Sequence, residues 1–362
     1  MIEHIRLINI NLPLNKAYNL SYNKISHFDV YYCAVFDGKN FGIGEIAPLE
    51  GYFDTKTNDI WGYNISAISS IAGTDSKDAF SIIKNLASKD KFLYSAIMTA
   101  LENIIYKIEN PDEKSSTFKL NLIGTLMNDD INEIPDAIKQ LVMEKYSVIK
   151  VKAGKDVEKD IIKIKNILDI LPENVKIRID ANQGYSFLDA KKFITSIHPS
   201  KAGKIELFEQ PLKTEEWVNM SKLNEFSEFP LMLDESIKGE EDIAKAVSLK
   251  CCSFIKLKLM KQGSFGEIKR IFNIAKDNGL NIIIGNGVQS EIGCINEAYI
   301  IDKLKANKFA SENNGFLKQS KIFLKKNIIK DDDGKFIFNP NFDFDIFYDG
   351  IKPFIVRERN FF

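Results

Sequence analysis

Cysteine and histidine are both scarce in this chain, and neither is clustered. Its 362 residues include 3 histidines, too scattered for a histidine-based zinc site or catalytic triad. The 4 cysteines lack the spacing of a metal or redox motif. We therefore expect buried thiols and a reducing, cytoplasmic setting. The residues concerned are His4, His27, His198, Cys33, Cys251, Cys252 and Cys294.

The chain also lacks a large net charge and a long apolar run. Its formal charge is −1, with 49 basic and 50 acidic residues interleaved along the sequence. Without a basic stripe, nucleic acid is not an expected partner. No stretch approaches the ~20 apolar residues of a membrane span, and residues 1–6 read as a strand rather than a signal peptide. The expected partner is a small molecule, with no membrane or nucleic acid involved.

Residues 1–115 have the pattern of an α+β domain. Residues 2–11 and 28–36 alternate as antiparallel strands, and a hairpin turn at Asp37-Gly-Lys-Asn40 leads into a strand over 41–46. Helical spacing is clearest from 93 to 108 and stops at Asn110-Pro111. Two polar loops, 15–27 and 48–57, flank the predicted sheet. A length of 362 residues itself suggests more than one domain.

From about residue 119 the chain alternates between strand-like and helix-like segments. Eight strands in such a series predict an α/β fold with a modified (β/α)8 barrel of the TIM type. We place this barrel domain at 116–320, and expect the tail, 321–362, to pack back on the N-terminal domain after a turn at Asp331-Asp-Asp-Gly334. The strand candidates are 118–123, 147–152, 175–180, 205–209, 230–234, 252–258, 281–285 and 308–312.

Five of these strands end in a charged side chain. In order, the five are Lys152, Asp180, Glu209, Asp234 and Lys258, separated by 24 to 29 residues. A barrel of eight units uses about 30 residues for each strand and helix. Each step is therefore one unit, and all five side chains are predicted at the C-terminal rim of the strands, where barrel enzymes place their chemistry.

The three acids in the middle of this series predict a divalent metal site. Asp180, Glu209 and Asp234 come from consecutive strands and offer hard oxygen ligands, which suit one Mg²⁺ ion. Without a cation, three converging carboxylates would repel one another.

The two lysines flank the acids and would reach a bound substrate from opposite faces. A lysine acts as a general base when its pKa falls towards neutrality. Lys150 shares a strand face with Lys152, and Lys256 with Lys258, so each supplies a nearby positive charge that favours the neutral amine. The metal would stabilise the enediolate formed when a proton leaves the carbon next to a carboxylate.

Simpler explanations exist for each residue alone. A Lys-x-Lys pair is often a solvated edge, and an aspartate after a strand is often a helix cap. Lys150 and Lys256 could merely fill the barrel mouth. Two other functional classes also stay open: a lysine-dependent aldolase, which needs no acidic trio, and a non-catalytic barrel, for which an unused metal site would be an electrostatic burden.

The same motifs resemble the enolase superfamily, in its muconate-lactonizing-enzyme subgroup. The resemblance implies that residues 1–115 and the tail form a capping domain on a catalytic barrel. It also implies Asp180, Glu209 and Asp234 as Mg²⁺ ligands, the lysine pair as acid and base, polar loops that close over a carboxylate substrate, and a homo-oligomer. The chemistry of a lysine base with an Mg²⁺-stabilised enediolate is established for that superfamily. The matching segments are Ile149-Lys-Val-Lys152, Arg178-Ile-Asp-Ala-Asn-Gln-Gly184, Phe208-Glu-Gln-Pro211, Leu233-Asp-Glu-Ser236 and Ile255-Lys-Leu-Lys-Leu-Met-Lys261.

The motifs point to more than one substrate. Residues 258–263 are similar to dipeptide epimerases, and residues 42–51 to o-succinylbenzoate synthases. In the former, two aspartates on the eighth strand hold the substrate ammonium, and Glu312 and Asn314 stand at those positions here. We expect racemisation or epimerisation of an amino-acid derivative or dipeptide, with o-succinylbenzoate-type dehydration or muconate-type cycloisomerisation as alternatives. The substrate-binding candidates are Asn182, Lys256, Asn286, Gln289, Glu312 and Asn314.

Overall fold

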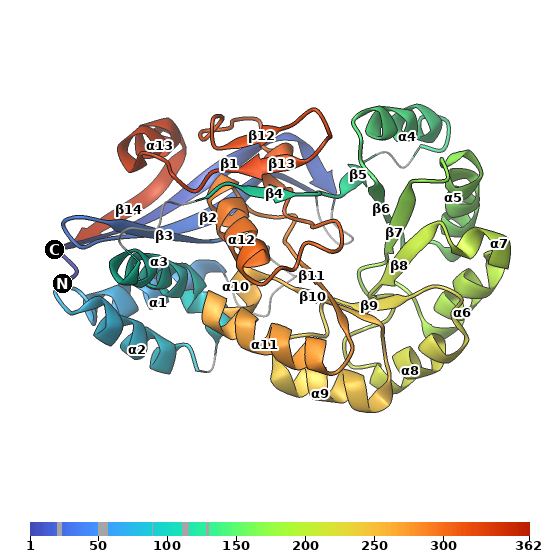
Figure 1. The fold of residues 1–362 in the computed structure, drawn as a ribbon, viewed down its shortest axis with the longest axis horizontal. Helices are drawn as coiled ribbons and strands as arrows, with labels where there is room; N and C mark the ends of the chain where they lie inside the picture. Colours follow the sequence, from blue (N-terminus) through green and yellow to red (C-terminus); the bar gives the residue numbers. More distant parts are fainter. Residues whose placement is uncertain (20–23, 50–56, 89, 111–115, 128–129) are drawn as a thin grey trace.

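The protein consists of a curled parallel sheet surrounded by helices and a mixed α/β cap beside it (Figure 1). This computed structural model describes residues 1–19, 24–49, 57–88, 90–110, 116–127 and 130–362. The two termini lie close together at the outer end of the cap (Figure 1). None of the helices within the described ranges has the length and apolar character that crossing a membrane requires.

The cap is built on an antiparallel sheet of four strands. Its order is β14-β1-β2-β3, from β1 (His4–Asn19), β2 (Lys24–Phe36), β3 (Phe41–Ile46) and β14 (Ile355–Phe361). The predicted hairpin turn is confirmed, since the Asp37 side chain accepts hydrogen bonds from the backbone N–H groups of Lys39 and Asn40. The cap helices are α1 (Thr57–Ser69), α2 (Ser76–Leu86) and α3 (Lys91–Glu109).

Two glycines let β3 approach α3 closely. A Cβ at Gly42 would lie 2.0 Å from the carbonyl oxygen of Ala100, and one at Gly44 would lie 2.0 Å from that of Ala96. Helix α3 begins after Asp90, which caps the backbone N–H groups of its first turn, and ends before Asn110, as the sequence predicts. The glycines of the 42–51 motif therefore have a packing role of their own.

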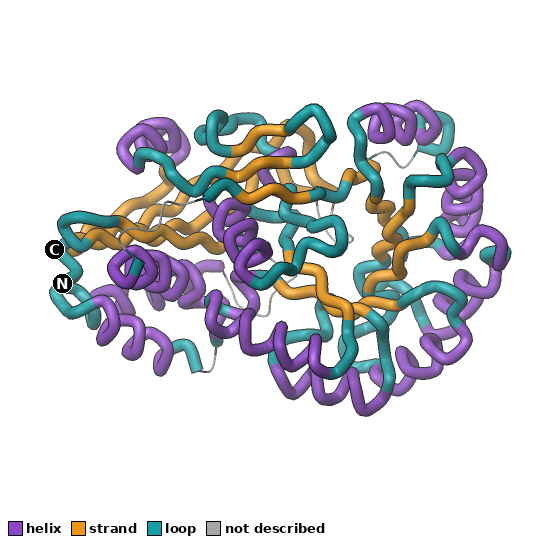
Figure 2. The backbone as a smooth tube through the Cα atoms, viewed as in Figure 1, coloured by secondary structure: helices purple, strands orange, loops and turns teal. Residues whose placement is uncertain are grey.

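Seven parallel strands form the barrel wall. Their order is unbroken, from β5 at one edge to β11 at the other, and helices lie on the outside of the curl (Figure 2). The strands are β5 (Gly124–Leu126), β6 (Val148–Lys152), β7 (Lys176–Asp180), β8 (Ile205–Glu209), β9 (Leu231–Leu233), β10 (Phe254–Leu257) and β11 (Asn281–Ile284). The predicted strands from 147 to 285 are thus confirmed within two residues at each end.

The barrel helices follow the strands in alternation. Several start at a side-chain cap: Asp156, Ser186, Ser264 and Ser290 each accept a backbone N–H hydrogen bond in the first turn of a helix. The helices are α4 (Ile134–Met143), α5 (Val157–Ile170), α6 (Phe187–Ser196), α7 (Pro199–Ala202), α8 (Trp217–Phe226), α9 (Glu240–Leu249), α10 (Leu259–Gln262), α11 (Phe265–Asp277) and α12 (Glu291–Lys303).

The first and eighth predicted barrel strands differ from expectation. Residues 118–123 do not form one strand, because β4 (Phe118–Leu120) pairs antiparallel with the tail strand β13 (Phe336–Phe338), and the barrel edge begins only at β5. Residues 308–312 form no strand. Ser311 alone makes a parallel bridge to Leu122, and beyond it the Asn314 N–H turns back to the Glu312 carbonyl. The barrel is closed there by a single bridge.

The C-terminal tail returns to the cap, as predicted. Strand β14 pairs antiparallel with β1, and β12 (Ile328–Lys330) forms a hairpin with β13 around the predicted turn at 331–334. The remaining elements are α13 (Phe344–Ile351) and two 3₁₀ segments, η1 (Gly315–Lys318) and η2 (Lys352–Phe354). The boundaries at 115 and 320 stay predictions, although β4 joins the tail across the first of them.

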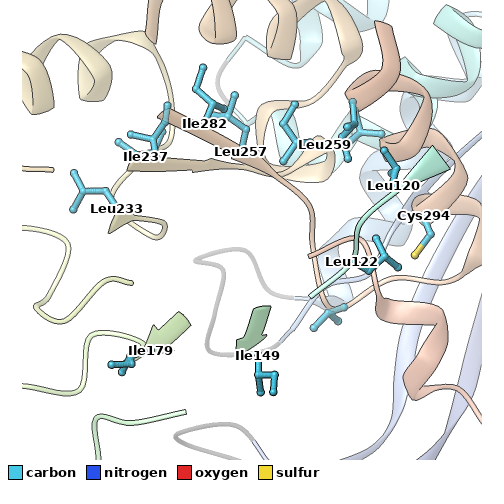
Figure 3. Close-up of a cluster of buried hydrophobic side chains, with 14 of the residues drawn as sticks. Leu120, Leu122, Ile149, Ile179, Leu233, Ile237, Leu257, Leu259, Ile282 and Cys294 are labelled. Carbon is cyan, nitrogen blue, oxygen red and sulfur yellow. The ribbon is translucent and has the colours of Figure 1, made fainter. Parts of the chain in front are cut away.

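Alternation along the barrel strands separates an outer core from a barrel interior. Ile149, Ile179, Leu233 and Leu257 belong to the large hydrophobic cluster between strands and helices (Figure 3). Neighbouring positions face the opposite way. Inside the barrel a small apolar group forms a plug, made of Leu207, Met232, Phe254 and Ile283, with Phe309 packed against it. On three of these strands, the residue two positions after the plug residue is charged: Glu209, Asp234 and Lys256.

Candidate active site

The five predicted rim residues lie together above the apolar plug. Lys152, Asp180 and Glu209 are direct register partners at the ends of β6, β7 and β8. Asp234 directly follows β9, and Lys258 directly follows β10. The sequence reasoning therefore placed all five at the correct end of the barrel.

Four buried side chains of alternating charge form a closed ring below the rim. Lys150 lies 3.0 Å from Glu209, and Lys256 lies 2.9 Å from the other oxygen of Glu209. Glu312 forms ion pairs with both of these lysines from the opposite side. The four residues are between 0% and 6% exposed, so each charge is held by opposite charges rather than by water.

The two outer lysines each contact one of the flanking acids. The Lys152 ammonium lies 2.7 Å from Asp180 Oδ2 and 2.5 Å from Asn182 Oδ1. On the other side, Lys258 lies 2.7 Å from Asp234 Oδ2. The Lys152 side chain is 34% exposed and that of Lys258 only 5%, so the described residues leave Lys152 the more accessible.

Burial and the lysines act in opposite directions on these carboxyl groups. Burial favours the neutral acid, but Lys150 and Lys152 outweigh it and hold the pKa of Asp180 well below its usual range. The same competition, with Lys258 as the main cation, holds the pKa of Asp234 well below its usual range. Burial lowers the pKa of Lys256 to about 7. Both flanking acids are therefore carboxylates at neutral pH.

The acids fit a divalent cation in their chemistry and their strand positions. Lys150 lies within 3.0 Å of both Asp180 and Glu209, and Lys256 lies 2.9 Å from Glu209 and 3.7 Å from Asp234. Hard carboxylate oxygens in such proximity suit Mg²⁺. Among the described residues, however, no three His, Cys, Asp or Glu side chains surround a common metal position, because the acids face lysine ammoniums. The shared metal position stays a prediction.

Asn182 lies beside Lys152, and two hydrogen bonds fix its position. Its side-chain nitrogen donates to Glu235 Oε1 at 3.0 Å, and its backbone N–H donates to Asp180 Oδ1 at 2.9 Å. Its φ is +40°, in the left-handed region that asparagine tolerates better than most residues. Of the predicted substrate-binding residues, Asn182 contacts the outer lysine Lys152, and Glu312 contacts Lys150.

The other predicted substrate-binding residues are engaged within the protein. Glu312 and Lys256 belong to the charged ring, and Asn314 donates to the Ile123 carbonyl at 3.0 Å. Asn286 and Gln289 both donate to Glu297 Oε2, through the backbone and the side chain respectively. Their roles towards a substrate stay predictions.

Sequence reasoning missed three buried residues that organise the site. Gln210 accepts hydrogen bonds from the backbone N–H groups of Asp234 and Ser236, Glu235 holds Asn182, and Glu297 holds the loop after β11. Gln210 and Glu235 each directly follow a predicted metal ligand, which was the available signal. Glu297 lies in the middle of α12, and nothing in its local sequence marks it.

The cap approaches the barrel mouth from the side of η1. Leu14 of β1 makes an antiparallel bridge to Gln319, and the Asn15 side chain donates to the Leu317 carbonyl. Most of the 48–57 loop, and residues 20–23 of the other predicted loop, lie outside the described residues. The predicted closure over a substrate is therefore untested for these segments.

Comparison with protein families agrees with this geometry. The family Enolase C-terminal domain-like matches residues 133–325, more than half of the chain. The protein belongs to this family. It is an enzyme of the enolase superfamily, in the muconate-lactonizing-enzyme subgroup that the motifs predicted.

Individual relatives include epimerases and a synthase. An L-Ala-D/L-Glu epimerase of Francisella tularensis subsp. novicida (strain U112) is 26% identical over 296 residues, covering 79% of this chain and 83% of the relative. An o-succinylbenzoate synthase of Geobacillus stearothermophilus is 28% identical over 163 residues, 45% of this chain and 42% of the relative.

A solved structure supports the fold over its whole length. The dipeptide epimerase of Cytophaga hutchinsonii, complexed with Mg and the dipeptide D-Ala-L-Val, superimposes with a TM-score of 0.86 at 18% identity. The match covers 100% of both chains. At this identity the likeness concerns the fold, and it includes both the barrel and the cap.

Proposed function

We propose that this enzyme, with Mg²⁺, racemises or epimerises an amino-acid derivative or dipeptide at the carbon next to a carboxylate, through an enediolate. The observation that carries the proposal is the placement of Lys152 and Lys258 on opposite sides of the acids at the barrel rim. The names of relatives, including epimerases acting on L-Ala-D/L-Glu, support the same reaction class.

In the proposed reaction one lysine amine takes the α-proton. The C–H bond breaks, its electron pair moves into the carboxylate group to form the enediolate, and the opposite lysine ammonium returns a proton to the other face. One configuration is converted to the other with no net loss of atoms. Positioned general acids and bases of this kind contribute about 10²–10⁴-fold each.

Asp180, Glu209 and Asp234 are the residues that would hold the metal. Bound there, Mg²⁺ would supply positive charge against the substrate carboxylate as the α-proton leaves. Lys150 and Lys256 keep the three carboxylates close together, and the buried Glu312 offsets the charge of both lysines. The small-molecule carboxylate would then enter above this layer.

Hydrogen exchange tests the proposal directly. The protein with Mg²⁺ in D₂O is incubated with dipeptides, N-acyl amino acids and the o-succinylbenzoate precursor, and the α-hydrogen is followed by NMR. We expect deuterium at the α-carbon and inversion of configuration for one amino-acid derivative. Absence of exchange from every compound would overturn the proposal, and borohydride trapping of a carbonyl substrate would favour an aldolase instead.

Dehydration to o-succinylbenzoate is the second candidate. The similarity to the Geobacillus stearothermophilus synthase favours it. In that reaction one lysine moves the proton and the other steadies the enolate by a cation–π contact. A new aromatic chromophore with the o-succinylbenzoate precursor, without inversion of any amino-acid derivative, would select this candidate.

A further inference from the structure

Two hydrogen bonds link Lys152 to the residue that follows Asp234 on the other side of the rim. They run from the Lys152 ammonium to Asn182 Oδ1 at 2.5 Å, and from Asn182 Nδ2 to Glu235 Oε1 at 3.0 Å. Glu235 directly follows Asp234, whose carboxylate contacts Lys258. The orientation of one lysine is therefore connected to the strand end that carries the acid opposite it.

The Asn182 end of this link is fixed by its backbone. Asn182 and Gln183 have φ values of +40° and +66°, so the two residues after β7 form a tight left-handed turn. The turn is tied down by the Asn182 N–H donating to Asp180 and by the Gln183 N–H donating to the Gln210 carbonyl at 2.8 Å. The amide of Asn182 is thus presented to Lys152 by a rigid backbone.

The Glu235 end is fixed by Gln210. The Gln210 side-chain oxygen accepts from the N–H groups of Asp234 and Ser236, at 3.0 and 3.2 Å, which defines the turn that carries Glu235. Glu235 is 6% exposed, and its second oxygen, Oε2, has no hydrogen-bond partner among the described residues. Because a buried carboxyl group without polar partners costs free energy, its bond to Asn182 is favoured.

We propose that Asn182 and Glu235 are positioning residues for Lys152. The proposal rests on the proposed two-lysine reaction. The Glu235 carboxylate fixes the Asn182 amide so that its oxygen, and not its nitrogen, faces the ammonium. Together with Asp180 Oδ2, this oxygen gives the lysine ammonium two fixed acceptors. Lys258 lies across the rim and donates to Asp234 Oδ2, so the role proposed for Asn182 and Glu235 concerns Lys152.

This asymmetry gives the experiment its readout. Displacing a reacting group by about 1 Å can lower a rate by about 10²-fold. In Asn182→Gly and Glu235→Leu, reprotonation from the Lys152 side should slow by about 10- to 100-fold. Starting from the configuration that Lys258 deprotonates, α-hydrogen exchange in D₂O should continue but inversion should fall. Starting from the other configuration, both exchange and inversion should slow.

Two further variants separate positioning from general damage to the fold. Glu235→Gln keeps an oxygen that accepts from Asn182. Its ratio of inversion to exchange should therefore stay close to that of the wild type. Gln183→Asn alters the next residue of the same turn, which tolerates the left-handed conformation, and should leave the ratio unchanged. Glycine fits the backbone at position 182, so Asn182→Gly remains informative should Glu235→Leu fail to fold.

The outcomes are distinct. Equal slowing of exchange from both configurations, with an unchanged ratio, would overturn the positioning role. An unchanged wild-type ratio in Asn182→Gly would overturn it as well. If the unmodified protein exchanges no α-hydrogen with any compound, the proposed function fails first, and the positioning role falls with it.

Discussion

At the scale of single residues, four lysines of two Lys-x-Lys segments divide into two kinds. Lys150 and Lys256 are buried in the ring with Glu209 and Glu312, and each also pairs with a third carboxylate, that of Asp180 or Asp234 respectively. Lys152 and Lys258 stand one position outward and each contacts an acid at the rim. Residues two positions apart on a strand lie on the same face, about 7 Å from each other, so the buried ring is separated from the two lysines that we propose as proton-transfer groups.

The outer lysines should be indispensable and their removal should leave the fold intact. Lys152→Ala and Lys258→Ala should each lower racemisation by about 10²–10⁴-fold, since each removes one of two proton-transfer groups. Turnover and circular dichroism would be measured together. Lys176→Ala is the matched control, because this exposed lysine lies at the opposite end of β7. Near-normal racemisation in either outer variant would remove that lysine from the mechanism.

At the scale of elements, a carboxylate of the cap joins β3 to the start of α12. Glu45 is buried and accepts hydrogen bonds from the Ser290 N–H at 2.7 Å, the Ser290 hydroxyl at 2.5 Å and the Gly293 N–H at 2.7 Å. A helix N-terminus favours negative charge, but burial outweighs these donors and raises the pKa of Glu45 to about 7.

This contact makes a prediction about stability and pH. Between about 4.5, the ordinary pKa of a glutamate, and about 7, folded Glu45 retains a proton that the unfolded chain has lost. The unfolded state binds fewer protons, so stability falls as pH rises through this window, by at most about 3 kcal/mol. The difference in free energy of unfolding between the wild type and Glu45→Gln, measured in urea, should therefore change across this pH window. A stability difference that stays constant from pH 4.5 to 7 would contradict the prediction.

At the scale of the whole molecule, the proposed metal would join three strands. A ligand that binds only the folded protein stabilises it by about 2.7 kcal/mol at 100 times its dissociation constant. Mg²⁺ should therefore raise the melting temperature, and Asp180→Asn should abolish this increase. Asp277→Asn, at the exposed end of α11, should preserve it. Equal stabilisation of the wild type and Asp180→Asn by Mg²⁺ would place the ion elsewhere.

Much of this architecture could be predicted because it follows from the periodic spacing of apolar residues along the chain. Strands β6 to β11 carry short apolar runs at regular spacing, and parallel strands place their C-terminal ends at one rim. Register then brought Lys152, Asp180 and Glu209 side by side, as predicted. The antiparallel cap strands and the tail hairpin also had clear turn signals.

The sequence by itself determined the barrel, the cap and the five charges at the rim, because strand periodicity and spacing depend on neighbouring residues alone. Only the tertiary structure decided that β4 leaves the barrel for the tail, that the eighth strand shrinks to the Ser311 bridge, and that Glu312 completes a buried ring. It also decided that Asn182 faces Lys152. These features depend on contacts between residues 30 to about 220 positions apart, which no local pattern encodes.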